Sequence, residues 1–390
     1  MTGSLDDFPT AVLLGIMFLI GLAADLIGRF TFLPRVTLLL LGGLALGPTG
    51  FALLPEAFLQ TWFPALTNIA LALIGFLLGQ QVSISALRLH GAQIITISIV
   101  KVIGTWLVVA AGLFALRADP VIVLLLAAIA SATAPTAIYD VVHEFRAKGE
   151  FVDTLLSVVA IDDVWGLILF ILVMAATGVL AGDASIGAGV ASGLREIGGS
   201  LLLGIALGIP MAYLTGRVRR GEPMLAEGMG FVLLGAGAAE WFQVSPILTA
   251  MTMGTTVASL AKHHERPFHA IEGIEWPFMI LFFVLAGASL ETAALEHAGF
   301  ATVAYVVLRC TGIYLGARIG CRIAGADEVT RKWLGLALFP QAGVAIGMAL
   351  LASQRFPDLA SAILTVVLAS TIFLEIFAPV VTRQALRASA

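Results

Sequence analysis

The sequence predicts an all-α polytopic membrane protein, and three observations support this fold class. Hydrophobic residues make up 59% of the 390 residues, charged residues only 12%, and the mean hydropathy is +1.03. This composition lies far from that of soluble domains. Apolar runs of about 20 residues, enough for a helix to cross a bilayer, recur along the whole chain. Two of these runs are interrupted by proline at matching places.

Thirteen membrane spans are expected, and loops rich in polar residues, glycine and proline separate them. The first span follows the acidic start MTGSLDDFPT, where a signal peptide would be basic, so we expect it to be retained. The later spans follow from the same apolar runs, read in order. The expected ranges are 8–29, 35–54, 62–80, 92–116, 120–142, 152–177, 196–216, 224–241, 244–260, 273–291, 298–317, 332–353 and 358–382.

Lysine and arginine are distributed unevenly between the loops on the two expected sides of the membrane. Loops on one side contain sixteen of these residues and loops on the other side contain two. Because the positively charged loops of membrane proteins stay in the cytoplasm, we expect the N-terminus outside and the C-terminus in the cytoplasm. A bacterial inner membrane is the location that the family resemblance described below implies. Nothing in the composition suggests nucleic-acid binding.

The thirteen spans divide into six, one linker and six, which places the two sets of six in opposite senses across the bilayer. Such inverted repeats are common in transporters. The fifth span is interrupted at SATAPT, 131–136, and the twelfth at PQAG, 340–343. Pro135 and Pro340 each remove a helical hydrogen bond. One proline alone could be an ordinary kink. The matched pair predicts two crossed broken helices, with Gln341 and Gly343 in the second break.

Two adjacent carboxylates, Asp162 and Asp163, lie inside the apolar run 151–177. A charge at membrane depth costs about 2.5 to 3.5 kcal/mol on insertion scales, so the pair needs water, a counter-charge or a cation. A soluble core helix with a satisfied acidic pair is the alternative, and the rest of the chain argues against it. The pair is therefore the leading candidate site.

Three further charged residues are expected at membrane depth. Arg309 and Asp162 each lie about 11 residues into their spans, roughly 16 Å deep at 1.5 Å per residue. We expect Arg309 to pair with Asp162 in preference to Asp163. Lys101 and Glu375 also match in depth. A structural ion pair between Lys101 and Glu375 is the expected arrangement, and a second titratable or cation-attracting site is the alternative.

Other acidic and titratable residues lie near the expected cytoplasmic face. Asp140 and His143 could attract cations or sense pH. Glu272 and Glu275 begin the tenth span and could line a cytoplasmic entrance. A solvated helix end would explain either pair equally simply.

These features together resemble the cation/proton antiporter superfamily, in particular bacterial sodium/proton antiporters with thirteen spans and an Asp-Asp motif. The most specific segments are AIDDVWGLILF around the two aspartates, SATAPTA, LFFVLAGASLE at 281–291 and the PQAG break. PRVTLLLLGGLALGPTG at 34–50 also resembles the second span of the family. The resemblance covers almost the whole chain. It implies that Asp163 binds cation and proton, that Asp162 is its partner, and that Arg309 is the basic residue of the core.

The same resemblance implies a homodimer in which a core domain moves against a dimerisation domain as an elevator. The implied parts are scaffold 1–90 (spans 1–3), core 91–177 (spans 4–6), linker 178–220 (span 7), scaffold 221–292 (spans 8–10) and core 293–390 (spans 11–13).

Three positions depart from the family pattern. Arg309 stands where electrogenic relatives usually have lysine, Ala134 where some have a carboxylate, and Gln341 with its neighbour Ala342 where some carry charge. Arginine stays protonated in proteins. If Arg309 holds Asp162 throughout the cycle, only Asp163 titrates and exchange is one-for-one and electroneutral. The Asp-Asp pattern favours electrogenic exchange instead, with Lys101 or Glu375 supplying a second proton.

The expected function is secondary antiport of a monovalent cation, Na⁺ or Li⁺, for H⁺, with a role in pH homeostasis. Hard cations prefer oxygen ligands, and Asp163, Asp162, the Thr133 hydroxyl and the carbonyl near Ala132 could supply them. Asp163 is thus a ligand for a monovalent cation only, and no cofactor is expected. K⁺/H⁺ exchange or potassium efflux is the nearest alternative, followed by a sodium-coupled organic anion symporter. No HExxH or GxSxG motif suggests an enzyme.

Overall fold

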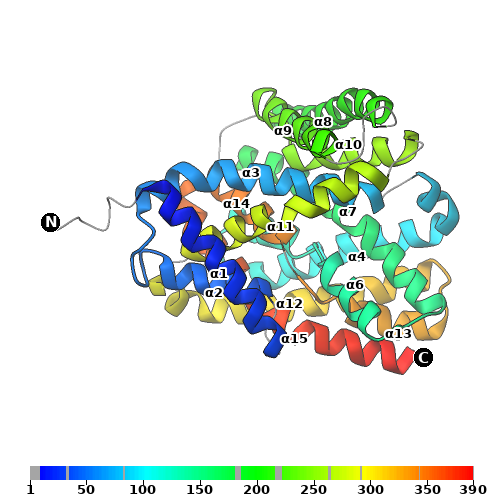
Figure 1. The fold of residues 1–390 in the computed structure, drawn as a ribbon. Coiled ribbons are helices and arrows are strands. Elements are labelled where there is room, and N and C mark those ends of the chain that lie inside the picture. The colour runs from blue at the N-terminus through cyan, green and yellow to red at the C-terminus, as the bar shows by residue number, and fades with distance from the viewer. Residues whose placement is uncertain are drawn as a thin grey trace.

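The chain folds into a bundle of helices (Figure 1). The structure, a computed structural model, describes residues 9–31, 35–81, 84–180, 186–215, 222–261, 265–289, 292–341 and 343–389. Almost all of them are helical and none lies in a strand, which confirms the all-α class. The helices are α1 (Thr10–Phe30), α2 (Arg35–Leu46), α3 (Glu56–Gln81), α4 (Ile84–Ala115), α5 (Pro120–Ile129), α6 (Pro135–Glu144), α7 (Glu150–Leu180), α8 (Ile186–Leu214), α9 (Glu222–Trp241), α10 (Pro246–Leu260), α11 (Glu265–Ala288), α12 (Thr292–Ile323), α13 (Glu328–Ala337), α14 (Gly343–Arg355), a 3₁₀ turn η2 (Pro357–Leu359) and α15 (Ala360–Ser389).

Eight of the described helices are long and apolar enough to cross a membrane by themselves, and four more apolar helices are shorter. Every expected span overlaps one helix or a pair of short helices. The second span is shorter than expected, since α2 ends at Leu46 and not at 54. Its last residues give way to a turn at Gly47 and Pro48, and proline offers no backbone N–H to continue a helix.

Both expected breaks are present. The first lies between Ile129, where α5 ends, and Pro135, where α6 begins. Proline suits the first position of a helix, because the N–H that it lacks would have no helical partner there. The second break separates α13 from α14. The two meet, because the Ala134 backbone N–H donates to the Pro340 carbonyl over 3.0 Å.

The helices pack in two groups. In the first, α4 packs along α12, α12 contacts α13 and α15, and α7 contacts α4 and α5. In the second, α3 and α8 pack against α10, while α2 and α3 pack against α11. Figure 1 shows α8, α9 and α10 at one side of the molecule and α12, α13 and α15 at the other. The groups meet mainly where α7 contacts α8, and also where α2 contacts α15 and where α3 contacts α7 and α14.

A row of glycines on α12 brings it against α4. A Cβ on Gly312 would lie 3.0 Å from the Thr105 Cα, and one on Gly316 would lie 2.8 Å from the Lys101 carbonyl oxygen. Gly320 meets Ile97 in the same way, at 2.9 Å from its carbonyl oxygen. Small residues four apart are the usual means by which membrane helices approach closely. This close approach places Lys101 beside Gly316 of α12.

Candidate functional site

The two adjacent aspartates lie near the middle of α7 and are both buried, with 0% of Asp162 and 1% of Asp163 exposed. The helix continues without a break through this region, so the pair is held on a rigid element. Around it, α7 packs on α4 and α5 and contacts α6, α13 and α14. Both aspartates lie close to Thr133 of the first break.

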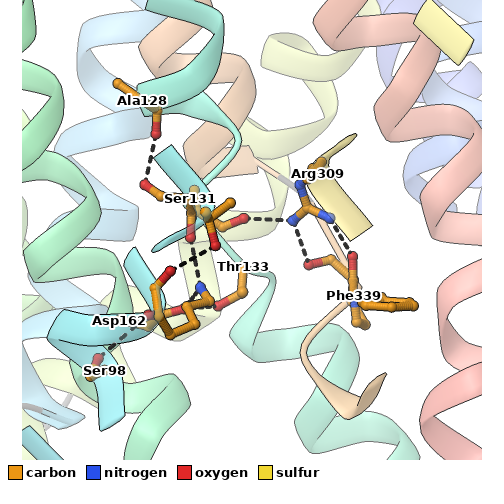
Figure 2. Close-up of polar contacts among 11 residues, drawn as sticks. Ser98, Ala128, Ser131, Thr133, Asp162, Arg309 and Phe339 are labelled. Carbon is orange, nitrogen blue, oxygen red and sulfur yellow. Dashed lines mark hydrogen bonds and ion pairs between the residues drawn. The ribbon is translucent and has the colours of Figure 1, made fainter. Parts of the chain in front are cut away.

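Asp162 is fully engaged by its neighbours. Lys101 forms a buried ion pair with Asp162 Oδ2, and the Thr133 hydroxyl donates to the same oxygen over 2.8 Å. Ser98 donates a longer hydrogen bond of 3.4 Å to Oδ1 (Figure 2). Lys101 Nζ also donates to the Ser131 carbonyl over 2.7 Å. These contacts tie Asp162 both to α4 and to the first break.

Asp163 has a different environment. Both of its carboxylate oxygens are buried, and neither accepts a hydrogen bond of normal geometry from any described residue. The backbone N–H of Thr133 is a polar group that approaches it. A buried carboxylate without a partner is costly unless it takes up a proton or a cation. The arrangement thus leaves one carboxylate neutralised and its neighbour free to bind.

Arg309 on α12 holds the two breaks together. Its guanidinium donates to the Phe339 carbonyl and to the Ala132 carbonyl, each over 2.7 Å, and to the Pro340 carbonyl over 3.4 Å (Figure 2). Carbonyls at a helix end have no helical donor, so the five N–H groups of arginine are suited to them. The carbonyl of Ala132, expected as a cation ligand, is therefore engaged by Arg309, although a carbonyl oxygen can accept twice.

The predictions of both ion pairs were wrong. Asp162 pairs with Lys101 and not with Arg309, because the guanidinium is occupied by the backbone carbonyls of the breaks. Glu375 does not pair with Lys101. It accepts a hydrogen bond of 3.0 Å from the Thr37 hydroxyl on α2. Matching depths along two helices do not determine which faces of those helices point toward each other.

The residues of the second break remain close to this centre. Pro340 accepts hydrogen bonds from Ala134 and Arg309, and Gln341 is fully buried. Gly343 begins α14, where a Cβ would lie 3.5 Å from the Phe283 ring, an ordinary contact distance. Ala342 lies outside the described residues.

The residues expected at the cytoplasmic face do not belong to the Asp162 network. Asp140 and His143 are exposed on α6 and lie close enough to interact electrostatically. Glu272 is exposed on α11 and pairs with His269 over 3.5 Å, whereas Glu275 is only partly exposed.

The sequence pattern did not mark Ser98 and Ser131 as site residues, although both help to place Lys101 and Asp162. A signal for Ser98 was present, because residues three apart on a helix share a face, and Ser98 precedes Lys101 by three. The Ser131 contact uses a backbone carbonyl, which no side-chain pattern encodes.

Comparison with known proteins decides the family. The sequence profile described as "Sodium/hydrogen exchanger, transmembrane" matches residues 14–384. The chain belongs to the sodium/hydrogen exchanger family. It is a multi-pass membrane transporter that exchanges cations for protons, and not an enzyme. A search of curated protein sequences found no match.

Two solved structures of a sodium proton antiporter share the fold of this chain. One is the sodium proton antiporter MjNhaP1 from Methanocaldococcus jannaschii at pH 8, with a TM-score of 0.78 and 16% identity over 97% of each chain. An electron-microscopy structure of the same antiporter has a TM-score of 0.75 and 16% identity, covering 96% of this chain and 95% of the other. At this identity the likeness establishes the fold, and the site residues follow from the geometry above.

Proposed function

We propose that the protein exchanges a monovalent cation, Na⁺ or Li⁺, for H⁺, and that Asp163 binds the cation and the proton in competition. The observation that carries this proposal is the difference between the two aspartates. Lys101 neutralises Asp162, while both oxygens of Asp163 are buried without a hydrogen-bond partner among the described residues. Asp163 can be neutralised by a proton or by a cation, and the two exclude each other because each satisfies the same charge.

The oxygen ligands for the cation come from Asp163 and the first break. The Thr133 hydroxyl donates its proton to Asp162, so its oxygen lone pairs remain available as acceptors. Sodium is a hard cation that prefers such oxygen ligands. The carbonyls of the break supply further oxygens, apart from those already engaged by Lys101 and Arg309.

Alternating access follows from a movement of one group of helices against the other. We assign 91–177 and 293–390 to a core that carries the ion, 1–90 and 221–292 to a scaffold that forms a homodimer, and 178–220 to a linker. The packing supports this division, because α4 contacts α7 and α12, and α12 contacts α15, while α10 packs on α3, and α11 on α2 and α3. Arg309 would keep the two breaks together while the core slides as an elevator.

The direct test uses purified protein in liposomes that contain a pH-sensitive dye. Na⁺, Li⁺, K⁺ and a neutral solute are added outside in turn after the liposome interior has been made acidic. We expect Na⁺ and Li⁺ to dissipate the gradient and the neutral solute to leave it unchanged. A response to K⁺ alone would replace the proposed cation, and a response to the neutral solute alone would contradict cation exchange.

A further inference from the structure

A buried hydrogen bond joins the two groups of helices away from the Asp162–Asp163 site. It runs from the Thr37 hydroxyl on α2 to Glu375 Oε2 on α15, over 3.0 Å. Thr37 is fully buried and Glu375 is 6% exposed. The two residues are far apart in sequence, so the contact exists only because α2 and α15 lie against each other.

The carboxylate of Glu375 lies at the N-terminal end of α2. Thr37 belongs to the first turn of this helix, and its backbone N–H approaches the same carboxylate as its hydroxyl. The N–H groups of a first helical turn have no helical acceptor, and the helix dipole places partial positive charge there. Glu375 thus acts on α2 as a capping residue supplied by another helix.

The nearby arginine is engaged elsewhere. Arg35, two residues before Thr37, forms an ion pair of 3.0 Å with Asp25 on α1 and lies 5.9 Å from the ring centre of Trp276 on α11. Arg35 also acts electrostatically on Asp140 of α6. The direct donors to the Glu375 carboxylate among the described residues are therefore those of Thr37.

This contact crosses the boundary between the proposed scaffold and the proposed core. The ion pairs Lys101–Asp162 and Arg383–Glu144 lie within the core, and Arg35–Asp25 lies within the scaffold. A sliding core would leave those pairs intact. It would separate Glu375 from the N-terminus of α2, because the two helices belong to different moving parts.

We propose that Glu375 and Thr37 form a latch that holds the core against the scaffold in the observed arrangement and opens when the core moves. This inference rests on the proposed core–scaffold movement. The latch involves no ion ligand, so it affects how often the core leaves this position and not how the cation is bound. Glu375 is in this sense a positioning residue.

The test measures the distance between scaffold and core in liposomes by double electron–electron resonance between two spin labels. Spin labels are attached at Leu19→Cys on α1 and Val380→Cys on α15, two positions that are 65% and 50% exposed. The background carries Cys310→Ala and Cys321→Ala, so that only the two chosen sites react. The wild-type latch in this background provides the reference distance distribution.

Four variants are compared in that background. Thr37→Val removes the hydroxyl at nearly constant volume, Thr37→Ser keeps it, and Glu375→Gln replaces the carboxyl group by an amide. Thr382→Val is the matched control, because the Thr382 hydroxyl on α15 bonds to the Ala337 and Ala378 carbonyls within the core.

We expect Thr37→Val to lower the population at the reference distance about tenfold relative to other distances, as for loss of one buried hydrogen bond. Thr37→Ser and Thr382→Val should retain the reference distribution. Glu375→Gln should shift it in the same direction as Thr37→Val, and combining the two should add no further shift. If Glu375→Gln does not fold, the contrast between Thr37→Val and Thr37→Ser still tests the latch.

An unchanged distribution in Thr37→Val, or an equal shift in Thr382→Val, would overturn the latch. Dye-based exchange by the same samples separates this failure from that of the proposed function. Unchanged distances with intact Na⁺/H⁺ exchange refute the latch alone, whereas absence of exchange in the wild type refutes the proposed function.

Discussion

At the level of single residues, the two adjacent aspartates differ in what surrounds them. Asp162 has Lys101, Thr133 and Ser98 as partners, whereas the carboxylate oxygens of Asp163 accept no hydrogen bond of normal geometry from the described residues. Identical side chains next to each other in sequence thus have separate roles, because neighbouring positions on a helix point in different directions.

The first prediction concerns Asp163→Asn. The amide can neither take up the transported proton nor neutralise a cation, so we expect Na⁺/H⁺ exchange to fall to the background of empty liposomes. Folding should be retained, since no ion pair is broken. Proteoliposome dye assays and thermal melting measure the two effects. Exchange at the wild-type rate in this variant would place the transport site elsewhere.

The second prediction concerns Asp162→Asn, which leaves Lys101 buried without its counter-charge. Breaking a buried pair in this way costs about 3 to 5 kcal/mol. We expect a marked loss of thermal stability. Adding Lys101→Met should recover most of it, because the second change removes the unpaired charge.

The matched control for this pairing is Arg309→Met in the Asp162→Asn background. Arg309 bonds to carbonyls and not to Asp162, so its loss should destabilise the protein further. Recovery by Arg309→Met and not by Lys101→Met would instead favour the pairing that the sequence suggested.

At the level of helices, sequence reasoning succeeded where one residue determines the backbone. Pro135 and Pro340 mark both breaks, and the apolar runs locate the helices within a few residues at most ends. It failed on the ion pairs, because Lys101, Arg309 and Glu375 have similar depths but different faces. The rotation of a helix about its axis depends on packing, here on the contact of α4 with the glycines of α12.

The third prediction tests that contact through Gly316→Val. A Cβ at this position would lie 2.8 Å from the Lys101 carbonyl oxygen, and backbone cannot move aside cheaply. We expect α4 to shift from α12, lowering stability by about 1 to 3 kcal/mol as in other overpacked sites. Exchange should fall as well, because the shift displaces Lys101 from Asp162. Melting and dye assays measure these effects.

Gly237→Ala on α9 provides the control for the third prediction, since no atom lies within 4 Å of a Cβ built there. Its melting temperature should be close to that of the wild type. Equal losses in both variants would mean that the α4–α12 contact has no special role.

At the level of the whole molecule, the transport cycle depends on one carboxylate that holds either substrate. The fourth prediction follows directly: protons and Na⁺ compete, so exchange should fall at acidic pH and recover when Na⁺ is raised. The measurement is the exchange rate across pH at several Na⁺ concentrations. If the exchange rate still falls at acidic pH when Na⁺ is saturating, a separate pH sensor is required. The exposed Asp140 and His143 are the first candidates for it.

The last prediction concerns the charge moved in each cycle. The sequence favoured one-for-one exchange on the premise that Arg309, which stays protonated, holds Asp162. The partner is Lys101 instead, and a lysine ammonium can release its proton. If cation binding at Asp163 displaces the proton of Lys101 as well as its own, two protons exchange for one Na⁺ and the cycle is electrogenic.

We therefore expect a membrane potential alone to drive Na⁺ movement. Proteoliposomes with equal Na⁺ and pH on both sides are given a valinomycin-set K⁺ potential, and ²²Na⁺ uptake is followed. Lys101→Arg keeps a positive charge beside Asp162 but cannot release a proton. It should lose the voltage-driven uptake while retaining exchange driven by a Na⁺ gradient. If the wild-type protein takes up no Na⁺ in response to the potential, exchange is one-for-one. If Lys101→Arg still shows voltage-driven uptake, the second proton comes from a group other than Lys101.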